Sequence, residues 1–223
     1  MIREIAYFLR HGPSVSRKQA TMGRAEFQQS VVEEIDKDGM AEFRSLLVEG
    51  LSGDVVEVGA GTGAMFRFYG DNVRVTAVEP DDDFRAAAAL AANEAHATIK
   101  VVPGVGESLP FEDASVDAVV GSVVLCSVQS VQQTLSEFKR VLKPKGNLRL
   151  LEHVRSEHWP AGFLMDLFNP MWLRVNNMGC NWNRRSFEAV RDVGFAIVST
   201  TTFKLYSPAA PTAFPYRLIK AVR

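Results

Sequence analysis

The run Asp-Val-Val-Glu-Val-Gly-Ala-Gly-Thr-Gly-Ala at residues 54–64 constrains the fold of this chain more than any other feature. Its three valines precede the first glycine, as expected for a fully buried parallel strand. The glycines at 59, 61 and 63 predict a tight turn that a ligand can approach closely, because glycine has no side chain and tolerates positive φ. A helix is expected to begin near Ala64. Strand, glycine-rich turn and helix are together the opening of a nucleotide-binding α/β unit.

Two interpretations of this turn differ in the charge of the ligand. Gly59, Gly61 and Ala64 formally fit the dinucleotide fingerprint, which would place a pyrophosphate at the helix N-terminus. However, Glu57 stands just before the turn, and the next expected strand ends in a second acid, Glu79. Carboxylates disfavour a pyrophosphate and favour a cation, and an acid at the second position commonly binds ribose hydroxyls. The pattern favours a cationic nucleoside. S-adenosylmethionine fits, because it has a ribose, an ammonium and a sulfonium but no phosphate.

Four sequence blocks occur together in the order and spacing of an enzyme family. They are E-V-G-A-G-T-G from residue 57, V-E-P from 78, L-P-F-E-D-A-S-V-D-A-V-V from 109 and F-K-R-V-L-K-P-K-G-N-L from 138. Over about residues 45–155 the chain therefore resembles the class I S-adenosylmethionine-dependent methyltransferases. This resemblance implies a Rossmann-like α/β fold, with a seven-stranded, mostly parallel sheet, an antiparallel last strand and helices on both faces.

The 223 residues are expected to form a single methyltransferase domain, 1–223. Residues 1–50 carry apolar side chains at helical spacing and predict an N-terminal helical cap over the cofactor cleft, or a segment that only packs on the sheet. Residues 154–185, after the fifth expected strand, are rich in large apolar side chains. They predict a substrate lid, cut into short helices by Pro160 and Pro170, with additional core as the alternative.

Composition argues against several classes of protein. The net charge of −1 gives no general attraction to nucleic acid. No apolar run approaches the roughly 20 residues of a spanning helix. A cytoplasmic location is therefore expected, and residues 1–11 allow at most a weak contact with a membrane surface. Cys126, Cys180 and the histidines at 11, 96 and 158 form no metal-binding pattern, so no metal is predicted. The oligomeric state is left open.

The resemblance also implies which residues hold the cofactor. Glu79 is expected to bind the ribose, and Phe84 to flank the adenine unless it is only part of the core. Many relatives carry an acid where Val105 stands, so the adenine is expected to be read by backbone groups near Gly106, with Glu107. The end of the fourth strand is expected to face cofactor and substrate. The full predicted set is Glu57, Gly59, Ala60, Gly61, Gly63, Glu79, Pro80, Phe84, Gly106, Glu107, Ser122 and Val123.

Flanking segments narrow the choice of methyl acceptor. F-R-S-L-L at 43–47, V-L-C-S-V at 124–128, L-E-H-V at 151–154, G-C-N at 179–181 and R-S-F-E-A at 185–189 resemble the alkyl thiol methyltransferases. Those relatives carry a long apolar N-terminal anchor that this chain lacks, which implies a soluble relative. The implied acceptor is a small apolar thiol. The alternatives are N- or O-methylation of a lipid, quinone or amine, an NAD-dependent oxidoreductase, and a non-catalytic protein that keeps the cofactor fold.

Methyl transfer to a thiol requires positioning and a thiolate rather than a covalent enzyme intermediate. His153 follows the fifth expected strand and is the candidate base or acceptor-orienting group, with a purely structural role as the alternative. Asp166 is a second candidate base. Cys126 stands where many relatives carry a histidine pair, and it is interpreted as a small buried hydrophobe rather than a nucleophile.

Overall fold

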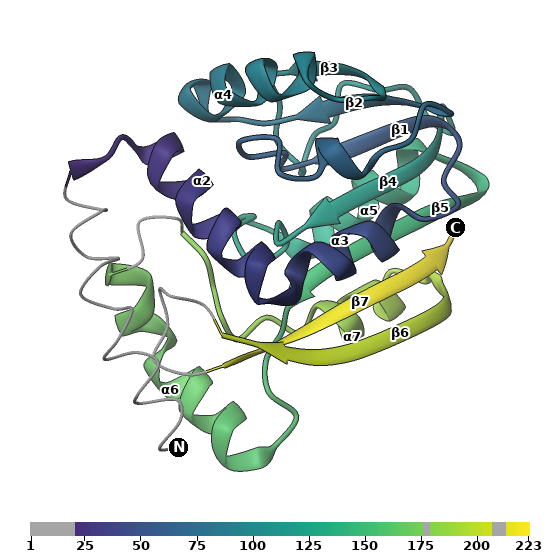
Figure 1. Cartoon of the computed structure of the whole chain (residues 1–223). Coiled ribbons are helices and arrows are strands. Elements are labelled where there is room, and N and C mark those ends of the chain that lie inside the picture. Colours follow the sequence, from purple (N-terminus) through teal and green to yellow (C-terminus); the bar gives the residue numbers. More distant parts are fainter. Residues whose placement is uncertain (1–20, 176–178, 207–212) are drawn as a thin grey trace.

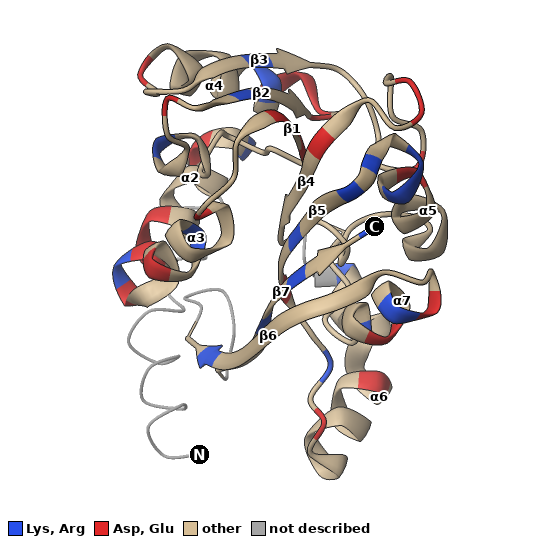
Figure 2. Cartoon of the chain, turned by 90° about the vertical axis from the view of Figure 1, so that its right-hand side faces the viewer, with Lys and Arg blue, Asp and Glu red and all other residues tan. Residues whose placement is uncertain are grey.

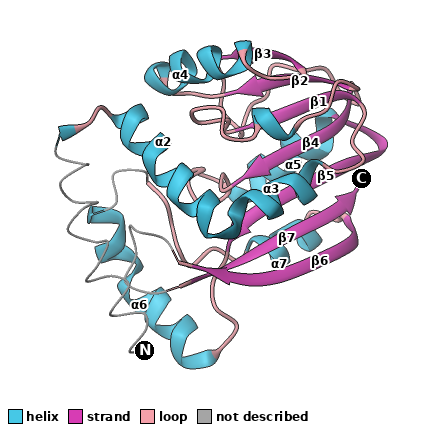
Figure 3. Cartoon of the chain, in the orientation of Figure 1, coloured by secondary structure: helices cyan, strands magenta, loops and turns pink. Residues whose placement is uncertain are grey.

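The computed structural model describes residues 21–175, 179–206 and 213–223, which build a seven-stranded sheet with helices on both faces (Figures 1 and 3). The strands are β1 (Gly53–Val58), β2 (Val73–Val78), β3 (Thr98–Val102), β4 (Val116–Ser122), β5 (Leu142–His153), β6 (Ala196–Leu205) and β7 (Phe214–Val222). Their order is β3-β2-β1-β4-β5-β7-β6. β1 to β5 pair in parallel, and β7 runs antiparallel to both of its neighbours. The predicted fold class is confirmed.

The helices form two separate cores with the sheet, because successive strand side chains point to opposite faces. They are α2 (Arg24–Ile35), η1 (Asp36–Met40), α3 (Ala41–Val48), η2 (Phe66–Phe68), α4 (Asp82–Asn93), α5 (Val131–Val141), α6 (Trp159–Val175) and α7 (Ser186–Asp192). On one face, Val55 of β1 belongs to a cluster with Leu47 of α3 and Ala88 of α4. On the other face, Val56 belongs to a cluster with Phe138 of α5 and Val190 of α7. Because helices cover both faces of the sheet, a ligand can reach it only at the ends of the strands.

The N-terminal segment predicted to cap the sheet is helical in its described part. α2 and α3 are joined by the π-helical turn η1, where Gly39 takes a φ of 114°. Figure 1 shows α2 on the side of the sheet where the arrowhead of β4 ends. Gln29 of α2 accepts a hydrogen bond from the Thr62 hydroxyl of the glycine turn at 2.7 Å, so α2 contacts that turn. The membrane contact predicted for residues 1–11 falls outside the described residues.

The helix expected to begin at Ala64 is replaced by the single 3-10 turn η2. Met65 and Phe66 are almost fully buried, and Tyr69 is buried just behind them. The chain must also enter β2 at Val73. The short connection between the glycine turn and β2 must bury these three side chains, and this leaves too few residues for an α-helix.

Segment 159–175 is one helix, α6, rather than the short helices expected from its prolines. Pro160 lies in the first turn, where a missing N–H costs nothing. Pro170 lies inside the helix, but its neighbours are anchored on both sides. Asn169 donates to the Asn181 side chain at 3.0 Å, and Trp172 donates to the Cys180 carbonyl at 2.9 Å.

The other side of α6 exposes large apolar side chains. Trp159 is 76% exposed, and Leu167 and Met171 are each 57% exposed. Figure 2 shows α6 mostly in tan, whereas acidic and basic residues lie close together around α3. No helix in the described part of the chain has both the length and the apolarity needed to cross a membrane.

Candidate cofactor and acceptor site

The glycine turn after β1 combines tight packing with an open position. Gly59 and Gly61 have φ of 69° and 56°, a region that favours glycine. A Cβ at Gly59 would meet Val124 Cγ2 at 2.5 Å, and a Cβ at Gly63 would meet the Phe66 ring at 2.8 Å. A Cβ at Gly61 would meet no atom within 4 Å. Gly61 is therefore the position of the turn where a ligand can approach the backbone.

Glu79 joins the glycine turn to the end of β2. Its Oε2 accepts the Gly61 N–H at 2.9 Å and its Oε1 accepts the Asp81 N–H at 3.0 Å. Burial raises the pKa of Glu79, although these two N–H groups lower it in part. A carboxylate can accept about four hydrogen bonds. Glu79 thus keeps capacity for ribose hydroxyls, the role predicted for it.

Glu57 is buried on β1, with only 2% of its surface exposed. Burial raises its pKa to about 8, although Tyr69 and Arg44 lower it in part. Its Oε2 has no hydrogen-bond partner among the described residues. A buried carboxylate oxygen without a partner is costly, and a cationic ligand would relieve that cost. Glu57 therefore fits a cation at this edge. Ala60, in the glycine turn that follows, is also buried.

The start of α4 carries the predicted adenine neighbour. Asp81 caps the helix by accepting the N–H groups of Asp83 and Phe84. Phe84 is buried, and the Arg24 guanidinium of α2 lies 5.4 Å from its ring centroid. Arg24 also pairs with Asp81 at 2.8 Å, so α2 closes over this end of the site. Pro80, between the two acids, is exposed.

Gly106 and Glu107 lie in a loop that is held against α5. Gly106 is buried, and a Cβ there would meet Thr134 at 3.0 Å. Glu107 Oε1 accepts the N–H groups of Gln129 and Ser130 at 2.7 and 3.2 Å. One oxygen of this carboxylate therefore binds backbone N–H groups at the start of α5. The contact between Glu107 and adenine stays a prediction.

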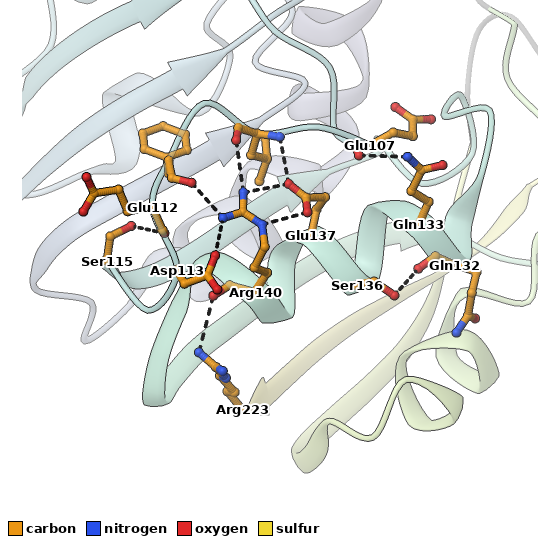
Figure 4. Close-up of polar contacts among 12 residues, drawn as sticks. Glu107, Glu112, Asp113, Ser115, Gln132, Gln133, Ser136, Glu137, Arg140 and Arg223 are labelled. Carbon is orange, nitrogen blue, oxygen red and sulfur yellow. Dashed lines mark hydrogen bonds and ion pairs between the residues drawn. The ribbon is translucent and has the colours of Figure 1, made fainter.

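Arg140 of α5 fixes the following part of the loop, as Figure 4 shows. It pairs with the carboxylates of Glu137 and Asp113 at 2.8 and 2.7 Å. It also donates to the carbonyls of Phe111 and Leu109 at 2.8 and 3.1 Å. A planar guanidinium with five donors suits this arrangement. Arg140 was not among the predicted site residues, although it lies within a block of the methyltransferase resemblance.

The end of β4 is linked to the N-terminal helices. Ser122 Oγ accepts a hydrogen bond from Arg44 of α3 at 2.8 Å, and Arg44 is paired with Asp36 at 2.9 Å. Val123 has a φ of 59°, which is rare for a β-branched residue and costs free energy. Its N–H bonds to the Leu151 carbonyl at 2.7 Å. Ser122 and Val123 therefore stand at a strained turn at the strand's carboxyl end.

His153, Cys126 and Cys180 come together beyond that turn. The distance between His153 Nε2 and Cys180 Sγ is 2.7 Å, and the three possible ligand atoms lie within 4.8 Å of one another. His153 and Cys126 are 5% and 1% exposed. The Cys126 thiol is buried as expected, but it is not isolated. Sequence spacing could not reveal this group, yet each residue lies in a separate segment of the thiol methyltransferase resemblance.

Hydrogen bonds hold the backbone around these three residues. Glu152 Oε1 accepts the N–H groups of Val124 and Leu125, each at 3.0 Å. Burial raises the pKa of Glu152 to about 7, although those N–H groups lower it in part. Asn181 donates its N–H and its side-chain amide to the Cys126 carbonyl at 2.8 and 3.1 Å. The turn after β4 is thus tied both to β5 and to the segment that follows α6.

Asp166, the second candidate base, forms an ion pair on α6. Arg155 donates to both carboxylate oxygens at 2.8–3.0 Å, and Asn183 donates at 3.2 Å. The Arg155 guanidinium lowers the pKa of Asp166 below its usual range. These contacts make it a weaker base than a free carboxylate.

The family model for a methyltransferase domain matches residues 56–150, the segment that carries the glycine turn, both acids and β4. The chain contains a methyltransferase domain. For this segment, the match confirms the predicted class, that of S-adenosylmethionine-dependent methyltransferases. The YcgJ protein of Bacillus subtilis has the same fold as this methyltransferase domain and its surroundings, with a TM-score of 0.67, 16% identity and coverage of 82% of this chain and 97% of that chain.

Two human proteins are similar to the methyltransferase domain and its flanks. Thiol S-methyltransferase TMT1A is 36% identical over 147 residues, which cover 64% of this chain and 59% of that protein. Thiol S-methyltransferase TMT1B is 35% identical over 153 residues, which cover 66% of this chain and 62% of that protein. The chain thus spans about three fifths of the length of these relatives.

Proposed function

We propose that this chain transfers the methyl group of S-adenosylmethionine to the sulfur of a small apolar thiol. The observation that carries the proposal is the contact between the two halves of the site. Val124 packs against Gly59 of the glycine turn, and its N–H bonds to Glu152, the residue before His153. The expected cofactor position and the Cys–His group are therefore neighbours at the same strand ends, where ligands of open α/β sheets bind. The human thiol S-methyltransferases support the choice of a thiol.

The side chains would work mainly by positioning. Bound S-adenosylmethionine supplies an activated methyl group on a sulfonium. Glu57 would hold its cationic end and Glu79 its ribose, which would fix the orientation of the methyl donor. Holding two reactants at near-attack distance contributes about 7–11 kcal/mol in well-oriented systems. Aromatic rings, such as Phe214 at 6.0 Å from the His153 ring centroid, would exclude water and strengthen the attraction between thiolate and sulfonium.

Titration calorimetry with S-adenosylmethionine and NADH, followed by turnover with a small alkyl thiol, tests the proposal. Binding of S-adenosylmethionine and formation of a methyl thioether support it. Binding without thiol turnover would assign the acceptor to a lipid, quinone or amine, if one of these is methylated. Binding of NADH alone would overturn the interpretation of the glycine turn.

His153→Ala is expected to lower thiol turnover at least about 100-fold, the usual scale for loss of an acid–base or orienting group. The dissociation constant for S-adenosylmethionine should change little, because His153 lies on the acceptor side. His96→Ala is the matched control, since His96 is exposed between α4 and β3. Equal losses of turnover and cofactor affinity in His153→Ala would contradict an acceptor-side role.

The affinity for S-adenosylmethionine is expected to depend on pH through Glu57. A cation favours the ionised carboxylate, so binding must draw the pKa of Glu57 down from about 8. This contribution strengthens binding as pH rises from 6 toward 8 and then levels off. The amino group of the ligand, with a pKa near 7.7–8.0, works in the opposite direction. Calorimetry at several pH values should therefore compare the native chain with Glu57→Gln, which lacks the titration of this carboxylate.

The free protein should show the complementary trend in stability. Because the pKa of Glu57 is raised in the folded state, the native protein binds more protons than the unfolded chain between about pH 4.5 and 8. Its stability relative to Glu57→Gln should therefore fall across that range. Parallel pH profiles of the two proteins, in binding and in stability, would remove Glu57 from the cation site.

A further inference from the structure

The group of Cys126, His153 and Cys180 has the composition of a metal centre. Two thiol sulfurs and one imidazole nitrogen are the ligand set of catalytic zinc sites that keep a fourth position open. Adjacent ligand atoms around a tetrahedral zinc lie about 3.3–3.8 Å apart, given Zn–S and Zn–N bonds of about 2.3 and 2.0 Å. The three atoms here lie within 4.8 Å of one another, with Nε2 and Cys180 Sγ at 2.7 Å, so side-chain movements of about 1 Å would bring them to this spacing. We propose that these three residues bind a zinc ion, and that the acceptor thiol takes its fourth position.

Hydrogen bonds fix the segments that carry Cys126, His153 and Cys180, as expected for residues that bind a ligand. Each residue comes from a different element: the turn after β4, the end of β5 and the segment after α6. Glu152 and Asn181 form hydrogen bonds with the backbone of the turn that carries Cys126. Trp172 donates a hydrogen bond to the Cys180 carbonyl. Such outer contacts orient ligands in metal sites. His153 is 5% exposed, and its Nε2 faces Cys180 Sγ at 2.7 Å, so this nitrogen lies where a ligand atom is needed.

The fourth position is left for an external ligand. Within the described residues, the group contains no fourth histidine, cysteine or carboxylate. Aromatic side chains lie around it instead: Phe214 and Tyr216 have ring centroids 6.0 and 6.3 Å from that of His153. An apolar thiol suits such a wall, and zinc prefers a sulfur ligand to most others.

Charge favours the same arrangement. Zinc with two thiolates and a neutral imidazole is a neutral centre, which can be buried at little cost. A third thiolate makes it −1, which attracts the +1 sulfonium of S-adenosylmethionine. This role of the metal rests on the proposed function, whereas metal binding itself does not.

The reaction balances with these components alone. The thiol R–SH binds zinc as R–S⁻ and releases its proton to solvent. The thiolate electron pair then forms the new S–CH3 bond, and the electrons of the CH3–S⁺ bond remain on the donor sulfur. The product R–S–CH3 is a neutral thioether, a weaker zinc ligand than a thiolate, and leaves the metal.

Metal content and cobalt spectroscopy test the site without an activity assay. The protein purified under reducing conditions is expected to hold about one zinc per chain. After chelation, titration with Co²⁺ should give a thiolate-to-cobalt charge-transfer band. Cys126→Ser, Cys180→Ser and His153→Gln should each weaken metal binding at least about 100-fold, since even outer-shell changes cost about 10–100-fold. His96→Gln, an exposed histidine, should leave it unchanged.

The native chain alone can overturn the proposal, even if a variant fails to fold. Absence of both zinc and the cobalt band would refute the site. So would a Cys126–Cys180 disulfide formed in place of the metal, or metal that all three variants retain.

The acceptor position has its own test. Addition of a small alkyl thiol to the Co²⁺ protein should shift the charge-transfer band, and removal of the metal should lower thiol turnover at least about 100-fold. An unchanged band, or full turnover without metal, would refute the acceptor role. Metal binding without any thiol turnover would refute the proposed function and the acceptor role but leave the metal site in place.

Discussion

Gly61→Val is expected to abolish S-adenosylmethionine binding in calorimetry, a loss of at least about 100-fold, or ~2.7 kcal/mol. The position has a φ of 56° and open space where a Cβ would project. Its N–H is already directed to Glu79, so the backbone cannot move away without releasing that acid. A valine would therefore occupy the space that the cofactor needs next to the backbone.

Backbone strain is the competing explanation for such a loss, and Gly50→Val controls for it. Gly50 has a φ of 72° and also has no atom within 4 Å of a Cβ. It lies between α3 and β1, at the opposite end of the strand. Both variants should lose about 1–2 kcal/mol of stability from the left-handed conformation. Only Gly61→Val should lose the cofactor. Equal affinities in the two variants would show that the turn does not hold the cofactor.

Local patterns were sufficient to predict the elements of the sheet. β1 ends at the glycine turn and β2 ends just before Glu79, as the order of residues predicted. Errors arose where tertiary packing outweighs local signals. α6 continues through Pro170 because Asn169 and Trp172 are anchored to another segment, and periodicity contains no information about such anchors.

The candidate site divides in the same way. The cofactor residues lie in contiguous blocks, so the turn at Gly59 and Gly61 was predictable from the order of residues. The group of Cys126, His153 and Cys180 is assembled from residues 27 positions or more apart. Its formation depends on how β4, β5 and the segment after α6 meet. Ligand-spacing rules cover only local motifs, and the prediction of no metal was based on those rules.

Asp36→Ala is expected to destabilise the protein by about 3–5 kcal/mol, the usual cost of leaving a buried charge without its partner. The side chains of Arg44 and Asp36 are 7% and 6% exposed and are joined at 2.9 Å. After the substitution, Arg44 keeps only its bond to the Ser122 hydroxyl among the contacts at this point. The melting temperature should fall on the order of 10 °C in a chain of this size. Because Ser122 ends β4, cofactor binding should weaken as well.

Two further variants separate the buried pair from other effects of the substitution. Arg67 also pairs with Asp36, at 2.7 Å, but its side chain is 59% exposed. Arg67→Ala should therefore cost less than about 1 kcal/mol. In Asp36→Ala/Arg44→Met both members of the buried ion pair are removed, so most of the lost stability should return. If the double variant were as unstable as Asp36→Ala alone, the loss would come from the packing of η1 rather than from the unpaired guanidinium.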